Sequence, residues 1–87
     1  MTLPDVEAPD LEARLLQFVR TELLGVRPIE IDADTQLFAE GLIDSLKVVQ
    51  LIAFLELQIG REIPDTEVLM KHFRTVRTMA DRFGRQR

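Results

Sequence analysis

The chain has 87 residues, of which 46% are hydrophobic and 30% charged, and its formal net charge is −4. This composition predicts one small globular domain over residues 1–87 and excludes a disordered chain. The predicted helices place the core of that domain at about 10 to 83, with frayed ends. The chain has no cysteine, which excludes disulfides and cysteine-based zinc sites, and no apolar run approaches the roughly 20 residues that cross a bilayer.

Charge is unevenly distributed along the chain. Residues 1–44 hold ten acids and three bases, whereas residues 45–87 hold five acids and eight bases. The last segment, residues 71–87, contains six bases against the single acid Asp81: Lys71, Arg74, Arg77, Arg82, Arg85 and Arg87. These bases either dock an acidic partner or balance the acidic first half. Nucleic acid is a poor partner for a net negative chain without aromatic residues among its bases.

Helical spacing of hydrophobic residues predicts a first helix from about Pro9 to Leu24. Its inward residues are Leu11, Leu15, Phe18, Val19 and Leu23. Residues 25–43 then form a long first loop, and a loop of this length in a small domain is usually functional or internally packed. We expect the loop to be anchored to the core by Leu37, Phe38 and Leu42.

Residues 45–59 form the second and most apolar predicted helix. Asp44 or Ser45 suits its N-cap, and Gly60 suits the residue after its end. The predicted inner face contains Val48, Val49, Ile52, Leu55 and Ile59.

A short third helical segment opens at Ile63-Pro64-Asp65. Thr75 can cap a fourth helix that runs through Phe83 and ends at Gly84, and residues 85–87 are expected to fray. No period-2 strand pattern occurs. The sequence therefore predicts an all-α fold, a compact four-helix bundle of three main helices and one short helix.

Several motifs stand in a characteristic order within these elements: Leu37-Phe38, the run Gly41-Leu42-Ile43-Asp44-Ser45-Leu46, Val49, Leu51-Ile52, Leu55, Ile63-Pro64-Asp65 and Phe73-Arg74-Thr75-Val76. Over residues 10 to 83 the chain thus resembles the acyl carrier proteins and the related peptidyl and aminoacyl carrier proteins. The resemblance implies covalent 4′-phosphopantetheine on Ser45, between Asp44 and Leu46, and an arm thiol that holds acyl or aminoacyl groups as thioesters. The absence of cysteine fits, since the arm supplies the sulfur.

The position of Ser45 suits this attachment on physical grounds. A helix N-terminus offers unpaired N–H groups and the positive end of the dipole, where a phosphodiester is stabilised. Two other interpretations are an ordinary N-cap serine and a nucleophilic serine. The second is disfavoured because the run is not Gly-x-Ser-x-Gly and the sole histidine, His72, is expected to be a solvated loop residue rather than a triad member or metal ligand.

The favoured function is a freestanding acyl carrier, not an enzyme, in polyketide, specialised lipid or other secondary-metabolite biosynthesis. The alternatives are an aminoacyl or peptidyl carrier, of the nonribosomal peptide or D-alanylation type, and a prosthetic-free helical adaptor. The implied partners are a phosphopantetheinyl transferase, an acyl- or aminoacyl-loading enzyme and a downstream synthase or transferase. The sequence shows no signal-peptide pattern and no long apolar run. We therefore expect a cytoplasmic monomer that binds neither membrane nor nucleic acid.

The second helix departs from many acyl carrier proteins, whose outer stripe is acidic and docks on basic patches of partner enzymes. Here we expect docking through Leu46, Lys47, Gln50, Phe54 and Leu57. This departure argues against a generic role in fatty-acid synthesis, although the apolar members could instead extend the core. An arm-bound acyl chain could enter an interior lined by Ile52, Leu55, Ile63, Val68 and Val76.

Overall fold

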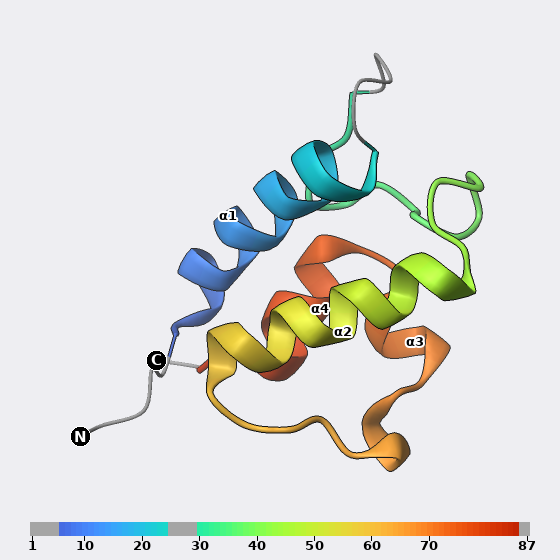
Figure 1. The fold of residues 1–87 in the computed structure, drawn as a ribbon. Helices are drawn as coiled ribbons and strands as arrows, with labels where there is room; N and C mark the ends of the chain where they lie inside the picture. The colour runs from blue at the N-terminus through green and yellow to red at the C-terminus, as the bar shows by residue number, and fades with distance from the viewer. Residues whose placement is uncertain (1–5, 25–29, 86–87) are drawn as a thin grey trace.

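Helices account for the regular structure of the chain, as the sequence predicts. The computed structural model describes residues 6–24 and 30–85, and within these ranges no β-strand is formed. Its elements in chain order are the helix α1 (Ala8–Phe18), the π-helical turn η1 (Val19–Leu23), α2 (Ser45–Ile59), the 3₁₀ turn η2 (Asp65–Glu67), α3 (Met70–Phe73) and α4 (Val76–Phe83). In Figure 1, α2 crosses the front of the molecule, α1 lies above it, and α3 and α4 lie behind. The expected all-α bundle is confirmed.

The first predicted helix contains a change of helical type. It is α-helical to Phe18 and continues as η1, where the Leu24 N–H donates to the Val19 carbonyl oxygen five residues earlier at 2.9 Å. The inward face follows the prediction at Leu11, Leu15, Val19 and Leu23, which are all buried, whereas Phe18 is half-buried. Such π turns are rare, and the hydrophobic spacing does not predict this one.

The predicted bounds of α2 are confirmed by caps at both ends. The Asp44 carboxylate accepts a hydrogen bond from the Lys47 N–H at 3.0 Å. At the other end Gly60 adopts the left-handed conformation with φ 73°, and its N–H donates to the Glu56 carbonyl oxygen. Both caps are formed by residues close in sequence and need no tertiary contact.

The face that α2 turns inward differs from the prediction at Val49. That residue was expected in the core, but 62% of it is exposed, whereas Leu51 and Leu55 are fully buried. The sequence of α2 is apolar on nearly every side, so its pattern does not single out one face. Packing of the remaining core decides which hydrophobic residues are covered.

The third predicted segment separates into η2 and α3, and α4 follows as expected. The Thr75 hydroxyl accepts a hydrogen bond from the Thr78 N–H at 3.0 Å, which caps α4. The inward residues of α4 are all buried: Val76, Met79, Ala80 and Phe83.

The prediction that residue 85 frays is wrong. The Arg85 N–H donates to the Val6 carbonyl oxygen at 2.8 Å, and the Ala8 N–H donates to the Arg85 carbonyl oxygen at 3.0 Å. A Cβ atom at position 84 would lie 2.7 Å from the Ala8 Cα, so glycine at 84 permits this close approach. The ends of the described core are therefore tied together; residues 86 and 87 lie outside the described part.

Candidate functional site

The loop before α2 delivers Ser45 to the surface in a fixed position. Gly41 turns the chain with φ 71°, and the N–H groups of Leu42 and Ile43 both donate to the Leu37 carbonyl oxygen, at 2.9 and 3.2 Å. Leu37 is fully buried, and its own N–H donates to the Arg74 carbonyl oxygen at 3.0 Å. Leu37 and Leu42 thus anchor the loop as predicted, whereas Phe38 is half-buried against the core. Ser45 is exposed as the first residue of α2.

The N-terminus of α2 favours a negatively charged group beside it. Asp44 accepts hydrogen bonds from two N–H groups, that of Lys47 through its carboxylate and that of Val48 through its carbonyl oxygen at 3.0 Å. Within residues 6–24 and 30–85, no acceptor pairs with the N–H groups of Ser45 and Leu46. These two donors and the helix dipole favour an anion beside the Ser45 hydroxyl. Because Asp44 provides the cap, the Ser45 hydroxyl is not needed for it.

An apolar cavity of about 310 Å³ opens beside Ser45. It lies between the first turn of α2, the segment before α3, and α3 itself. Its lining residues are Phe38, Ser45, Val48, Val68, Leu69, Met70 and Phe73. Of the five residues expected to line an acyl site, only Val68 lines this cavity; Leu55 and Val76 are fully buried in the core instead.

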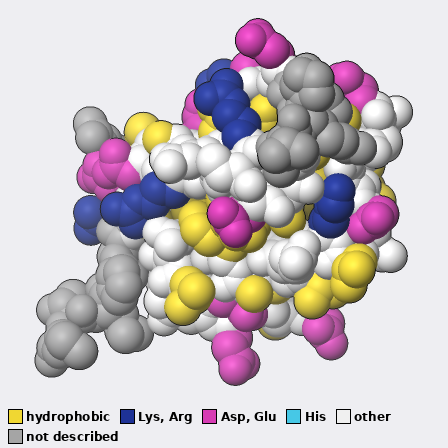
Figure 2. Space-filling view, turned by 45° about the horizontal axis from the view of Figure 1, so that its top comes forward, with side chains coloured by type: hydrophobic (Ala, Val, Ile, Leu, Met, Phe, Trp, Pro, Cys, Tyr) yellow, Lys and Arg dark blue, Asp and Glu magenta, His cyan; other side chains and the backbone are white. Residues whose placement is uncertain are grey.

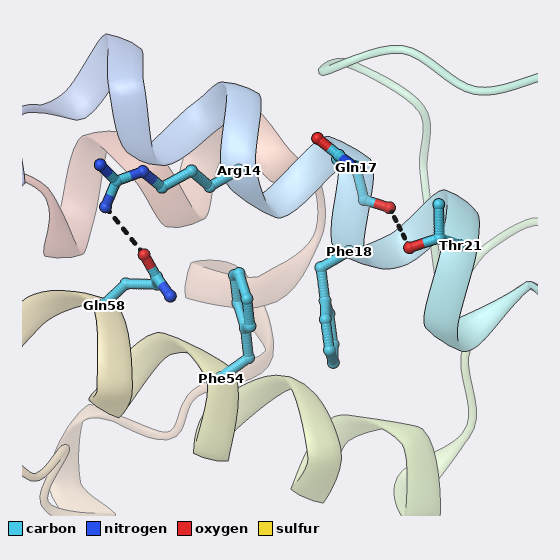
Figure 3. A pocket seen from close by; sticks show the side chains of 6 residues that line it. All are labelled: Arg14, Gln17, Phe18, Thr21, Phe54 and Gln58. Carbon is cyan, nitrogen blue, oxygen red and sulfur yellow. Dashed lines mark hydrogen bonds between the residues drawn. The ribbon is translucent and has the colours of Figure 1, made fainter.

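A second groove, of about 320 Å³, lies between α1 and α2 (Figure 3). The rings of Phe18 and Phe54 stack there with centroids 4.2 Å apart, and an Arg14 guanidinium N–H donates to the Gln58 side-chain oxygen at 2.8 Å. Phe54 was expected on the exposed docking stripe, but it is half-buried and packs on α1. Nine residues from Ser45, it lies on roughly the opposite side of α2, so this groove does not join the Ser45 cavity.

The outer face of α2 presents the other predicted docking residues. Leu46 and Leu57 are 72% and 74% exposed, Gln50 is exposed, and Lys47 is half-buried. Val49, which the hydrophobic pattern places inside, joins them on this face. Figure 2 shows hydrophobic side chains in a row across the lower half of one face of the molecule. We call Leu46, Val49, Gln50 and Leu57 the α2 stripe.

The described part of the chain contains no cluster of side chains suited to catalysis or to metal binding. No group of three or more His, Asp or Glu side chains there could hold a metal ion. His72 is half-buried in α3, not a solvated loop residue as expected: its Nδ1 lies 2.9 Å from the Glu67 carbonyl oxygen, and its ring meets Phe83 edge-on. No hydrogen bond joins His72 to Ser45, so a serine triad is not assembled among the described residues.

The comparison with known proteins agrees with the geometry around Ser45. Residues 13–83 match the family model described as phosphopantetheine attachment site. The chain belongs to the phosphopantetheine-dependent carrier protein family. Its cofactor is covalent 4′-phosphopantetheine, which when bound supplies a thiol for thioester formation. An exposed serine hydroxyl, two unpaired N–H groups and an adjoining apolar cavity fit that group.

Two known proteins are similar to this chain. A D-alanyl carrier protein from Enterococcus faecalis is 42% identical over 43 residues, which are 49% of this chain and 55% of that protein. The match thus spans about half the length of that relative. A chain in the solved structure titled "Crystal structure of FAD-dependent dehydrogenase" has a TM-score of 0.70 at 34% identity, covering 77% of this carrier and 94% of that chain. No helix in the described residues of the carrier is long and apolar enough to span a membrane.

Proposed function

We propose that Ser45 is the attachment site of the 4′-phosphopantetheine arm. Its exposure at the first turn of α2 allows a transferase to reach the hydroxyl, and the free N–H groups there stabilise the phosphodiester. Asp44 holds the turn through its hydrogen bond to the Lys47 N–H. Since members of this family carry the arm, the prosthetic-free adaptor hypothesis is not retained.

The cargo that we propose is an aminoacyl group, held as a thioester and delivered to separate enzymes. The observation that carries this proposal is the 42% identity to a D-alanyl carrier protein. The chain itself would not be a catalyst. Its contribution is positional, because a tethered cargo reaches a partner's active site at high effective concentration.

Three classes of partner follow from this proposal. A phosphopantetheinyl transferase installs the arm, and a loading enzyme adds the amino acid. The similarity to a chain in a structure of a FAD-dependent dehydrogenase supports a flavin dehydrogenase as the downstream partner. It would remove two hydrogen atoms from the cargo and reduce FAD to FADH₂. The α2 stripe supplies the exposed apolar surface on which these enzymes would dock.

A second candidate function is an acyl carrier for polyketide or specialised lipid synthesis. The apolar cavity beside Ser45 favours it, because aliphatic and aromatic side chains line nearly all of its wall. An acyl chain gains free energy by leaving water there, whereas the ammonium group of an amino acid does not.

The two candidates are separated by the mass of the native cargo. The protein is purified at mildly acidic pH from the cells that produce it, and the arm with its cargo is released from the intact protein in a mass spectrometer. We expect the mass of an amino acid in thioester linkage. A purely fatty-acyl or dicarboxylic-acyl mass contradicts the first proposal and supports the second. Ser45→Ala, expressed in the same cells, should carry neither arm nor cargo.

A further inference from the structure

Five of the six bases in residues 71–87 lie in the described part of the chain, and these five do not all have the same role. Arg77 pairs with Asp34 at 2.7 Å, and Arg82 pairs with Glu67. Arg85 lies 3.6 Å from Glu7. These three arginines thus neutralise acids elsewhere in the carrier.

Lys71 and Arg74 differ from them. Both side chains are exposed, and neither pairs with an acid in residues 6–24 or 30–85. They stand three residues apart at α3, a spacing that places helical side chains on one side as neighbours. Two adjacent cations without counter-charges repel each other slightly, and an acidic ligand relieves that repulsion.

Exposed hydrophobic residues adjoin this cation pair. Leu69 is 42% exposed and Met70 59% exposed. Met70 and Phe38 line both the cavity beside Ser45 and a neighbouring hollow of about 320 Å³, whose wall includes Arg74. The cations therefore border the surface from which the arm departs.

We propose that Leu69, Met70, Lys71 and Arg74 form a docking site for a partner segment that presents carboxylates around an apolar centre. The proposal rests on the function proposed above, since such a partner would act on the arm at Ser45. Charge complementarity carries it: a net negative protein keeps two unpaired cations beside exposed hydrophobic side chains next to its attachment site. Cations at an interface rim speed encounter and reject basic surfaces, while the apolar residues supply contact area.

Two synthetic helical peptides test this proposal. Both carry the same leucine stripe, flanked by glutamates in one and by lysines in the other. Binding is followed by backbone amide shifts in the isotope-labelled protein. We expect the glutamate peptide to shift residues 69–74, and the double variant Lys71→Glu/Arg74→Glu to weaken it about tenfold. Arg61→Glu, which changes an exposed cation just beyond the C-terminal end of α2, is the matched control and should change affinity less than about twofold.

Several results would overturn the proposal: equal affinity for the two peptides, shifts centred away from residues 69–74, or equal weakening by the control variant. Tighter binding to phosphatidylserine vesicles than to the glutamate peptide would instead assign the cations to a membrane surface. Lys71→Gln/Arg74→Gln, which introduces no new charge, provides a second variant if the double glutamate does not fold. All measurements are repeated in Ser45→Ala. Peptide binding needs no arm, so failure of arm attachment and failure of this docking site are separate outcomes.

Discussion

The Asp44 carboxylate accepts the Lys47 N–H at 3.0 Å across the residue that we propose as the attachment site. Asp44 thereby takes the capping role that Ser45 could have filled. The division leaves the serine hydroxyl free for modification while the first turn of α2 stays fixed. On this proposal the two adjacent residues have separate roles, Asp44 in stability and Ser45 in chemistry.

Removing the Asp44 cap should destabilise the protein but leave the Ser45 hydroxyl in place. Asp44→Ala loses the side-chain acceptor, and we expect a loss of about 1 kcal/mol in the free energy of unfolding, measured in urea. Asp44→Asn keeps an oxygen in the same place and should stay within about 0.5 kcal/mol of the wild type. Equal destabilisation by both changes would show that charge rather than capping matters there.

Two leucines of α2, two residues apart, should respond differently to truncation. Leu55 is fully buried, so Leu55→Ala should lower the free energy of unfolding by about 2–5 kcal/mol through lost burial and a cavity. Leu57 is 74% exposed, and Leu57→Ala should change it by less than about 0.5 kcal/mol. Thermal unfolding of both variants checks the assigned inner face of α2. Similar losses in the two would contradict it.

Charge on the α2 stripe should impair loading while leaving the fold intact. We expect Leu46→Asp/Leu57→Asp to raise the KM of the holo-protein for its loading enzyme about tenfold, because apolar contacts are lost at the docking surface. Ala13→Asp places a similar charge on the exposed face of α1 and should leave the KM unchanged. Circular dichroism confirms folding in each case. Unaltered loading of the double variant would contradict the proposed surface.

The pairing of Asp34 with Arg77 should make a small contribution to acid sensitivity. The hydrogen bond from Arg77 holds the pKa of Asp34 below its ordinary value of 3.8. A lowered folded pKa means that the stabilisation is present above that value and is lost as the pH falls through the lower folded pKa. Asp34→Asn should therefore be less stable than the wild type at neutral pH, and the difference should shrink below pH 3.8.

The measurement is the free energy of unfolding against pH at low salt, because Asp34 is exposed and its pairing is screened. Glu40→Gln removes an exposed carboxylate of the same loop that pairs with no base in residues 6–24 and 30–85, and it is the control for the loss of one negative charge there. A difference between Asp34→Asn and the wild type that grows as the pH falls would contradict the assignment.

Sequence reasoning succeeded where the determinant is local. The bounds of α2 follow from Asp44 and Gly60, and the start of α4 follows from Thr75, since each acts within a few residues. The placement of Ser45 was predicted for the same reason. Its position at a helix start is fixed by adjacent residues, whatever the rest of the chain does.

Sequence reasoning failed where distant residues decide the outcome. Val49 is exposed and Leu51 buried because the rest of the core selects one side of a helix that is apolar all round. Phe54 is covered by stacking on Phe18, thirty-six positions earlier. Likewise Arg85 is ordered by backbone bonds to the opposite end of the core. The spacing of residues within one segment does not predict these contacts between distant segments.

Arm attachment at Ser45 is tested by transfer from coenzyme A with a purified broad-specificity phosphopantetheinyl transferase, followed by measurement of the intact mass. We expect the wild-type protein to gain the mass of one 4′-phosphopantetheine. We expect Ser45→Ala, shown to be folded by circular dichroism, to gain none. A gain in Ser45→Ala, or none in the folded wild type, would contradict the assignment of Ser45 as the attachment site.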